Sequence, residues 1–396
     1  MKFIADTLEK VKPNFEKGGK LEWAYPAFEA AETFVLTPDT VTRGRVHIRD
    51  WLDSKRLMTT VVVALLPCTL MAMWNTGMQR MIATGAQPNH LLAIGLGALA
   101  FLPLYFITVA AGGLWEVLFA VVRKHEVNEG FFVTSLLFPL IVPPTLPYWQ
   151  AAVAISFGVV IGKEVFGGTG RNILNPALTA RAFLFFSWPG QISGEGIWRF
   201  VDSSKDKIVD GISAATPLGV AAVAQSGGDI IKAVNEAGYT FTDLFLGTIP
   251  GSMGETSTLA CLLGAAYLIL TKIGSWRIML SCVIGALLIS TLLNLLSGQV
   301  ENPMFSVPPH YHLVMGGFAF GAVFMATDPV SAAATNTGKW IYGFLIGALA
   351  ITIRTVNPAY PEGMMLAILL MNVFAPIIDH VVAQANIKRR LLRGAR

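Results

Sequence analysis

The stretch Asp210–Thr216 has the sequence DGISAAT and lies in a polar interval, residues 189–255, of an otherwise apolar chain. Transfer of a phosphate-bearing group to a hydroxyl needs an accessible Ser or Thr in a narrow peptide. The small residues before Thr216 provide that narrowness, and the following Pro217 favours an exposed turn. Because loops rich in Ser, Thr and Ala are common, an ordinary surface loop is the alternative interpretation of this pattern.

A second candidate site is a glycine-rich turn at residues 167–176, with the sequence GGTGRNILNP. In it, Gly168 and Gly170 are followed by Asn172 and Asn175 before a short apolar run. Backbone N–H groups at a helix start favour anions or polar ring edges, and Asn amides offer both donors and acceptors. No strand precedes the turn, so it is not a dinucleotide-binding fingerprint. A re-entrant turn capped by Asn is the alternative.

Two acidic residues lie in or at the end of apolar segments. Glu116 follows the pair Gly112-Gly113 and Trp115, and Asp379 lies near the end of the last segment. An ionisable side chain at membrane depth is a functional candidate, and paired glycines let a flat ring or a second backbone approach closely. The alternative for the first group is close helix packing with Glu116 at headgroup level. A carboxylate suits a hard cation such as Na⁺, although one carboxylate is not a complete site.

The composition indicates a polytopic membrane protein. Apolar residues make up 54% of the 396 and charged residues only 14%, whereas a soluble domain carries about a quarter charged residues. Several apolar segments are shorter than the roughly 20 residues that a continuous helix needs to cross a bilayer. Short segments interrupted by Gly and Pro predict broken or re-entrant helices enclosed in protein. The apolar segments are approximately 57–74, 91–122, 131–142, 150–166, 177–188, 256–272, 278–296, 313–326, 340–353 and 364–383.

The distribution of Lys and Arg predicts the orientation. With the N-terminus in the cytoplasm and ten crossings, 23 of these residues, Arg181 among them, fall on the cytoplasmic side and 6 on the opposite side. Both termini are therefore expected in the cytoplasm and the 189–255 interval outside.

We expect an all-α polytopic membrane protein of about ten transmembrane helices in two inverted five-helix halves. Its expected parts are a cytoplasmic arm (1–56), a first transmembrane half (57–188), an external loop (189–255), a second transmembrane half (256–383) and a basic cytoplasmic tail (384–396). The triplet Asn175-Pro176-Ala177 is repeated as Asn357-Pro358-Ala359, on opposite faces by the crossing count, as an inverted repeat requires. Two tripeptides are weak support for a repeat.

The DGISAAT stretch resembles the D-x-x-(S/T)-x-A-T motif on which a flavin transferase attaches FMN to Thr through a phosphoester. Ala214 stands where the motif often has Gly or Ser. With its ten spans and basic arm, the chain resembles from end to end the B-subunit family of sodium-translocating NADH:quinone oxidoreductases (Na⁺-NQR). The related D subunits of Rnf complexes usually lack so long an arm. The resemblance implies covalent FMN on Thr216, with Asp210, Ser213 and Ala215 as further motif residues.

The resemblance also implies the remaining cofactors and partners. Riboflavin is expected without a covalent bond at Gly168, Gly170, Asn172 and Asn175, ubiquinone at Gly112, Gly113 and Trp115, and a Na⁺ pathway at Glu116 and Asp379. Electrons would then pass from the periplasmic side to ubiquinone near the cytoplasmic side, coupled to Na⁺ export. The implied setting is a multi-subunit complex of the bacterial inner membrane, with a periplasmic flavoprotein subunit, and a flavin transferase is needed for maturation. The chain shows no nucleotide-binding domain and no C-x-x-C pair, so NADH oxidation is expected in a flavoprotein and iron–sulfur partner; nucleic-acid binding is not expected.

A channel or transporter of the urea or aquaporin type, without a redox cofactor, is the alternative function. The Asn-Pro-Ala triplets resemble those of water and glycerol channels, and the five-plus-five arrangement resembles urea-channel-type scaffolds. A shared scaffold would explain the symmetry without transport of urea.

Overall fold

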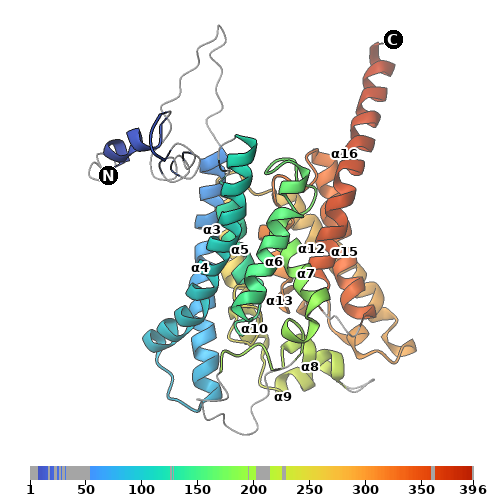
Figure 1. Ribbon diagram of the computed structural model, residues 1–396. Helices are drawn as coiled ribbons and strands as arrows, with labels where there is room; N and C mark the ends of the chain where they lie inside the picture. The colour runs from blue at the N-terminus through green and yellow to red at the C-terminus, as the bar shows by residue number, and fades with distance from the viewer. Residues whose placement is uncertain are drawn as a thin grey trace.

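The computed structural model describes residues 8–16, 18–21, 25, 28, 32, 54–124, 127, 129–194, 196–201, 215–224, 229–357 and 362–394. Within these ranges all regular secondary structure is helical (Figure 1). The prediction of an all-α fold is confirmed.

In the described part of the chain, six helices are long and apolar enough to cross a membrane. Five of them are continuous helices, and the shortest of these has 20 residues. This corresponds to a length of about 30 Å at 1.5 Å per residue, which matches the thickness of the hydrocarbon core of a bilayer. Large apolar side chains such as Leu99 and Phe106, each 63% exposed, cover the outer faces of these helices, as lipid contact requires. The chain is therefore a multi-pass membrane protein. The six helices are α3 (Ser54–Ala83), α4 (His90–Arg123), α6 (Tyr148–Val160, the span continuing to Phe166 through Lys163 and Glu164), α12 (Trp276–Leu295), α15 (Asn336–Val356) and α16 (Met364–Gly394).

The other four apolar segments are short or interrupted, as predicted. They are α5 (Gly130–Leu140), α7 (Pro176–Ser187), α11 (Thr258–Leu270) and a segment divided into α13 (Tyr311–Val314), α14 (Phe318–Phe320) and the π-helix η7 (Gly321–Met325). The backbone N–H of Gly254, before α11, donates to the carbonyl of Leu140, at the end of α5, at 2.7 Å. This irregular backbone is satisfied inside protein rather than against lipid.

Corresponding helices pair in the same way in the two halves. In the first half α4 contacts α6 and α6 contacts α7; in the second, α12 contacts α15 and α15 contacts α16. These are the second, fourth and fifth segments of each half, which is consistent with the predicted repeat. The two Asn-Pro-Ala triplets differ in role, however, because Asn175 caps the start of α7 whereas Asn357 ends α15. Pro358 and Ala359 lie outside the described residues.

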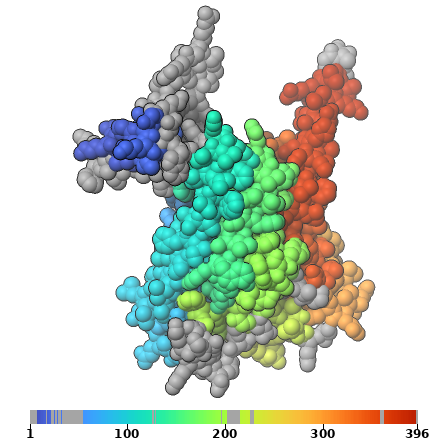
Figure 2. Space-filling view, in the orientation of Figure 1, coloured from blue at the N-terminus to red at the C-terminus, as the bar shows by residue number. Residues whose placement is uncertain are grey.

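The start of α3 and the end of α16 lie at one end of the bundle, and the short helices within residues 217–223, 230–236 and 241–246 lie at the other (Figure 1). We call these the inner and outer ends. The last turns of α16 stand clear of the other helices at the inner end (Figure 2). At the outer end, α8 (Pro217–Val223), α9 (Ile230–Glu236) and α10 (Phe241–Leu246) pack with α13 and the 3₁₀ turn η6 (Pro303–Ser306) around a small apolar core that includes Leu218, Leu244 and Met304. The described helices of the polar interval are thus held by a core of their own.

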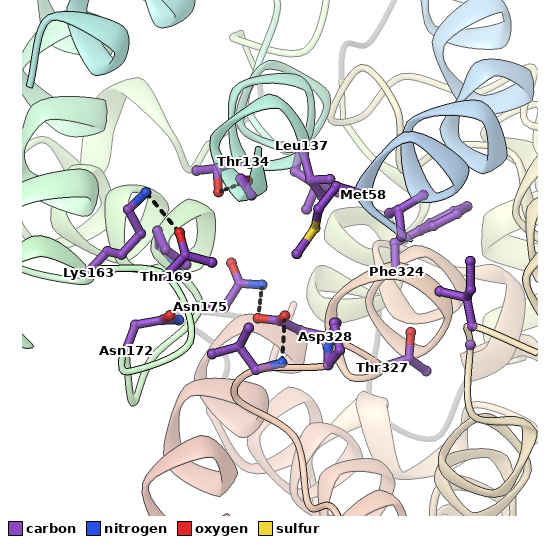
Figure 3. Close-up of a pocket in the computed structure, with 18 of the residues that line it drawn as sticks. Met58, Thr134, Leu137, Lys163, Thr169, Asn172, Asn175, Phe324, Thr327 and Asp328 are labelled. Carbon is purple, nitrogen blue, oxygen red and sulfur yellow. Dashed lines mark hydrogen bonds between the residues drawn. The ribbon is translucent and has the colours of Figure 1, made fainter. Parts of the chain in front are cut away.

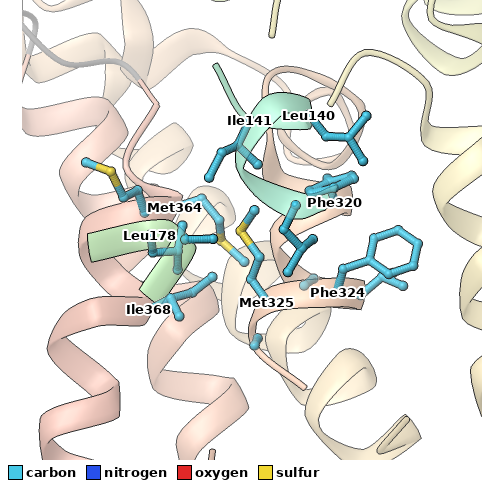
Figure 4. Close-up of a cluster of buried hydrophobic side chains, with 14 of the residues drawn as sticks. Leu140, Ile141, Leu178, Phe320, Phe324, Met325, Met364 and Ile368 are labelled. Atoms are coloured by element: carbon cyan, nitrogen blue, oxygen red, sulfur yellow. The ribbon is translucent and has the colours of Figure 1, made fainter. Parts of the chain in front are cut away.

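The broken segments converge on the centre of the bundle. Apolar side chains from α5, α7, η7 and α16 pack there with 0–3% of their surface exposed (Figure 4). We call this set the central cluster: Leu140, Ile141, Leu178, Phe320, Phe324, Met325, Met364 and Ile368.

Candidate functional site

The inner pocket encloses about 670 Å³ of space, part of it open to solvent, and contains both predicted asparagines (Figure 3). Its polar lining comes from the Gly-rich turn, α5 and the segment after η7. Its apolar lining comes from α3, α5, α11 and η7. The polar residues of the lining are Thr134, Lys163, Thr169, Asn172, Asn175, Thr327 and Asp328.

The two asparagines have structural partners as well as pocket-facing positions. Asn175 Oδ1 accepts from the backbone N–H groups of Ala177 (3.0 Å) and Leu178 (3.2 Å) and thereby caps α7, while its Nδ2 donates to Asp328 Oδ2 at 3.4 Å. Asn172 Oδ1 accepts from Gly170 N, and its Nδ2 donates to the carbonyl of Leu174. The capped-turn interpretation is therefore correct for Asn175, and it is compatible with a ligand role because a carbonyl oxygen has a second lone pair.

Gly168 and Gly170 shape the turn rather than line the pocket. Their φ angles are +93° and +89°, a region that side chains with a Cβ rarely adopt. The turn can therefore reverse direction tightly after α6 and present Asn172 to the pocket.

A buried charge network borders the inner pocket. The Lys163 ammonium forms an ion pair with the Glu116 carboxylate of α4, and each side chain is 4% exposed. Lys163 Nζ also donates to Thr169 Oγ1 at 3.3 Å and lies 3.6 Å from Glu164 Oε1. Glu164 in turn pairs with Arg123 at 2.9 Å. The predicted sodium-pathway acid is thus linked by one lysine to the pocket that contains the predicted flavin asparagines.

The face formed by Gly112 and Gly113 is covered by the ring of Phe131 from α5. A Cβ on Gly112 would lie 2.5 Å from this ring, whereas one on Gly113 would lie 3.6 Å from it. Trp115, partly buried, packs against the main core. The flat ring that uses these glycines in the structure therefore belongs to the protein itself.

Asp379 does not line the inner pocket. Its carboxylate accepts from Ala334 N (2.6 Å), Thr335 N (3.0 Å) and Thr335 Oγ1 (2.5 Å). It therefore holds the start of α15 from the neighbouring helix α16.

The outer pocket, of about 340 Å³, contains Thr216. Thr216 caps α8, and its Oγ1 accepts from Gly219 N at 3.1 Å. The hydroxyl is partly exposed and uses its oxygen only as an acceptor in this contact, so the O–H is chemically available. Asp210 and Ser213, the other predicted motif residues, lie outside the described residues.

A tyrosine positions the backbone next to Thr216. The hydroxyl of Tyr239 donates to the carbonyl of Ala215 at 2.9 Å. Burial raises the pKa of Tyr239 above its usual value of 10, against the opposing effect of the Arg199 guanidinium beside it. The hydroxyl is consequently a protonated donor throughout the physiological pH range.

The floor of the outer pocket contains charged residues that are far apart in the sequence and whose contact was not predicted. Arg181 of α7 pairs with Glu255 at 2.9 Å and lies 3.8 Å from Glu362. The prediction that Arg181 lies on the cytoplasmic face is therefore wrong: it is buried in the bundle. Lys163 on the same predicted side and Arg354 on the opposite side are also buried. Leaving out these three residues changes the predicted charge count from 23 against 6 to 21 against 5. A charged residue inside the short apolar segment 177–188 was the signal that could have identified Arg181.

The central cluster separates the two pockets. Gly317 lines the outer pocket and Thr327 the inner pocket, while residues 318–325 between them are mostly fully buried. Figure 4 shows apolar side chains filling this region. Such packing does not favour an open pore for a small polar solute.

The NQR2, RnfD, RnfE family profile matches residues 41–388. The chain belongs to this family. Among curated relatives, the B subunit of the Na(+)-translocating NADH-quinone reductase of Ectopseudomonas mendocina (strain ymp) is 54% identical over 410 residues, covering 98% of each chain. The proteins of the same name from Stutzerimonas stutzeri (strain A1501) and Klebsiella pneumoniae (strain 342) are 53% and 51% identical, again over 98% of each chain.

Proposed function

We propose that this chain is the B subunit of a Na⁺-translocating NADH:quinone reductase. Full-length identity of 51–54% to proteins of that name supports the assignment. The name implies a multi-subunit complex, and we assign NADH oxidation to a flavoprotein and iron–sulfur partner. A channel without a redox cofactor is not favoured by these relatives or by the central cluster.

The observation that carries the cofactor proposal is the position of Thr216 at the mouth of the outer pocket. Thr216 would hold FMN through a phosphoester, attached by a flavin transferase at the motif that includes Ser213. The lining of this pocket brings Thr216 together with buried polar side chains, and a buried carboxylate oxygen without a partner among the described residues points to a ligand with a donor. FMN would supply electron-carrying chemistry at the outer end.

Riboflavin is proposed for the inner pocket. Asn172 and Asn175 would hold it through their amides, in a cavity walled by apolar residues such as Met58 and Phe324. A mostly apolar pocket with a few convergent polar groups is typical of cofactor sites.

Ubiquinone and Na⁺ are proposed to act near the inner end. Ubiquinone would bind beside Gly112, Gly113 and Trp115, where it must replace or share the contact with the Phe131 ring. Glu116 and Asp379 would contribute carboxylate oxygens to the Na⁺ pathway. Because both carboxylates are bound to protein groups in this structure, each must exchange those contacts to receive a cation.

The outer end is proposed to face the periplasm and the inner end the cytoplasm of a bacterial inner membrane. The excess of Lys and Arg at the inner end supports this orientation. The outer flavin would then accept electrons from a periplasmic flavoprotein subunit, and ubiquinone would be reduced near the cytoplasmic side.

The test is the fluorescence of denatured protein on a gel after co-expression with the flavin transferase. The wild-type band should fluoresce under ultraviolet light, the Thr216→Leu band should be dark, and Ser213→Ala should retain most of the signal. A dark wild-type band would remove the central support for the proposal.

A further inference from the structure

The outer pocket has two ends of different chemistry. Around Thr216 its walls are apolar, formed by Trp198, Pro217, Leu218 and Ile249. Its other end is polar, formed by the buried Ser252, Glu255 and Thr256 and by the partly exposed Glu362. A ligand that reaches the polar end from Thr216 must therefore be flat or slender, apolar along its length and polar at its far edge.

Glu255 leaves one carboxylate oxygen without a hydrogen bond. Its side chain is 5% exposed, and its Oε1 accepts from Arg181 Nη1 at 2.9 Å. Its Oε2 is buried and finds no donor in the described part of the chain. A buried acceptor without a hydrogen bond is unfavourable, and more so when it is charged, so this oxygen is best explained by a donor that a ligand brings.

We propose that the isoalloxazine ring of the flavin on Thr216 occupies this pocket and donates its N3–H to Glu255 Oε2. The proposal rests on the proposed attachment at Thr216. The pyrimidine edge of a flavin presents one N–H between two carbonyls. Thr256 Oγ1 accepts from Asn75 Nδ2 at 3.5 Å, which leaves its own O–H able to donate to one of those carbonyls.

Two glycines make room for this polar end. A Cβ on Gly317 would lie 2.7 Å from Glu255 Oε1, and a Cβ on Gly316 would lie 2.5 Å from Leu218 Cδ1 and 3.0 Å from Glu362 Oε1. Side chains at these positions would push the carboxylates into the pocket. The Gly316-Gly317 break between α13 and α14 therefore preserves the space and the placement of Glu255.

The charges at this end argue against a metal cation or a phosphate as occupant. The Arg181 guanidinium lies 2.9 Å from the Glu255 carboxylate and 3.8 Å from that of Glu362. A second guanidinium is close by, because Arg354 Nε donates to the backbone carbonyl of Glu362 at 3.4 Å. A cation finds no net negative charge there, and a phosphate would face a carboxylate oxygen. A neutral ring with an N–H at its edge is compatible with the balanced charges and with the carboxylate oxygen.

The experiment is a spectroelectrochemical titration of the covalent flavin in the purified complex with Glu255→Gln, Glu255→Asp and Glu236→Gln. Removing a negative charge beside the ring favours the reduced flavin. We expect Glu255→Gln to increase the reduced-to-oxidised ratio at a fixed potential by at least tenfold, which is about 59 mV for a one-electron step. Glu236, an exposed acid on α9, is the charge-matched control and should change nothing.

Glu255→Asp retains the charge that faces Arg181 but withdraws the oxygen from the ring. It should leave the potential near that of the wild type and shift the flavin carbonyl bands in the infrared difference spectrum. It also serves as the second variant if Glu255→Gln fails to assemble.

Gel fluorescence of each variant separates the two proposals. A dark wild-type band would contradict attachment at Thr216 itself. Normal fluorescence together with an unchanged potential in Glu255→Gln, or unchanged infrared bands in Glu255→Asp, would overturn the placement of the ring while leaving the attachment intact.

Discussion

The ammonium of Lys163 and the carboxylate of Glu116 form an ion pair whose two side chains are each only 4% exposed. The pair joins α4 to the short link between α6 and the Gly-rich turn, and its two residues are 47 positions apart in sequence. It borders the inner pocket on one side and the Gly112 face on the other. The ion pair therefore connects Glu116, one of the two proposed sodium ligands, with the pocket proposed for riboflavin.

Removing the lysine of this pair should destabilise the protein more than neutralising the glutamate. Lys163→Met leaves the Glu116 carboxylate buried without this cation, at a cost of about 3–5 kcal/mol. Glu116→Gln should cost less, because Lys163 retains Glu164 at 3.6 Å. Thermal unfolding of the purified complex measures both, with the exposed Lys124→Met as control. The double variant Lys163→Met/Glu116→Gln should lose less stability than the two single variants lose together. If the losses of the single variants simply add, a direct interaction between the two side chains is contradicted.

Gly112 and Gly113 should respond differently to the same substitution. Gly112→Ala drives a methyl group into the Phe131 ring and should cost about 1–3 kcal/mol, partly relieved by Phe131→Leu. The methyl group of Gly113→Ala meets the ring at ordinary contact distance. This variant should be neutral or slightly stabilising, because Ala is more favourable than Gly in a helix by about 1 kcal/mol. If ubiquinone uses this face, the quinone KM should rise in Gly112→Ala more than in Gly113→Ala. Equal effects on stability and KM would refute the difference in packing.

Asn175 should have separable structural and ligand roles. Asn175→Ala removes the cap of α7 and should cost about 1 kcal/mol, while Asn175→Ser retains a capping oxygen. Both substitutions remove the amide, so both should lower the amount of non-covalent flavin released on denaturation to half or less. Only Asn175→Ala should lower the unfolding temperature appreciably. Full flavin content in both variants would exclude Asn175 from the riboflavin site.

Asp243 should make the outer end sensitive to acid. A hydrogen bond from the Thr240 hydroxyl, supported by the Thr240 backbone N–H and the Thr248 hydroxyl and opposed by slight burial, lowers the pKa of Asp243 below 3.8. A depressed pKa contributes stability that is present above the unfolded-state value and is lost as pH falls through the folded-state value. Thermal unfolding between pH 3 and pH 6, a range set by the carboxyl pKa of about 3.9, should show a smaller acid loss in Asp243→Asn than in the wild type. An identical pH dependence in the two proteins would show that this capping box contributes nothing.

The membrane segments could be predicted because their signal is local. Pro143 and Pro144 end the segment that contains α5, and Gly316-Gly317 interrupts the segment that contains α13 and α14. Such breaks follow from backbone chemistry that each residue carries by itself. The capping role of Asn175, at the start of α7, could be predicted for the same reason.

The pocket floors could not be predicted because they depend on residues far apart in the chain. Arg181 and Glu255 are 74 residues apart, and charge counting placed Arg181 at the wrong membrane face. Lys163 was counted only as a surface charge, although it is buried against Glu116. The ring of Phe131 on Gly112 was equally invisible, since the sequence does not show which segment covers a glycine face.

The most direct test of the account is tandem mass spectrometry of the peptide that contains residues 210–219, from protein matured with its flavin transferase. The account predicts a single peptide carrying FMN through a phosphoester on Thr216, absent in Thr216→Leu and present in Ser213→Ala. FMN found on Ser213, or an unmodified peptide in the active complex, would contradict it.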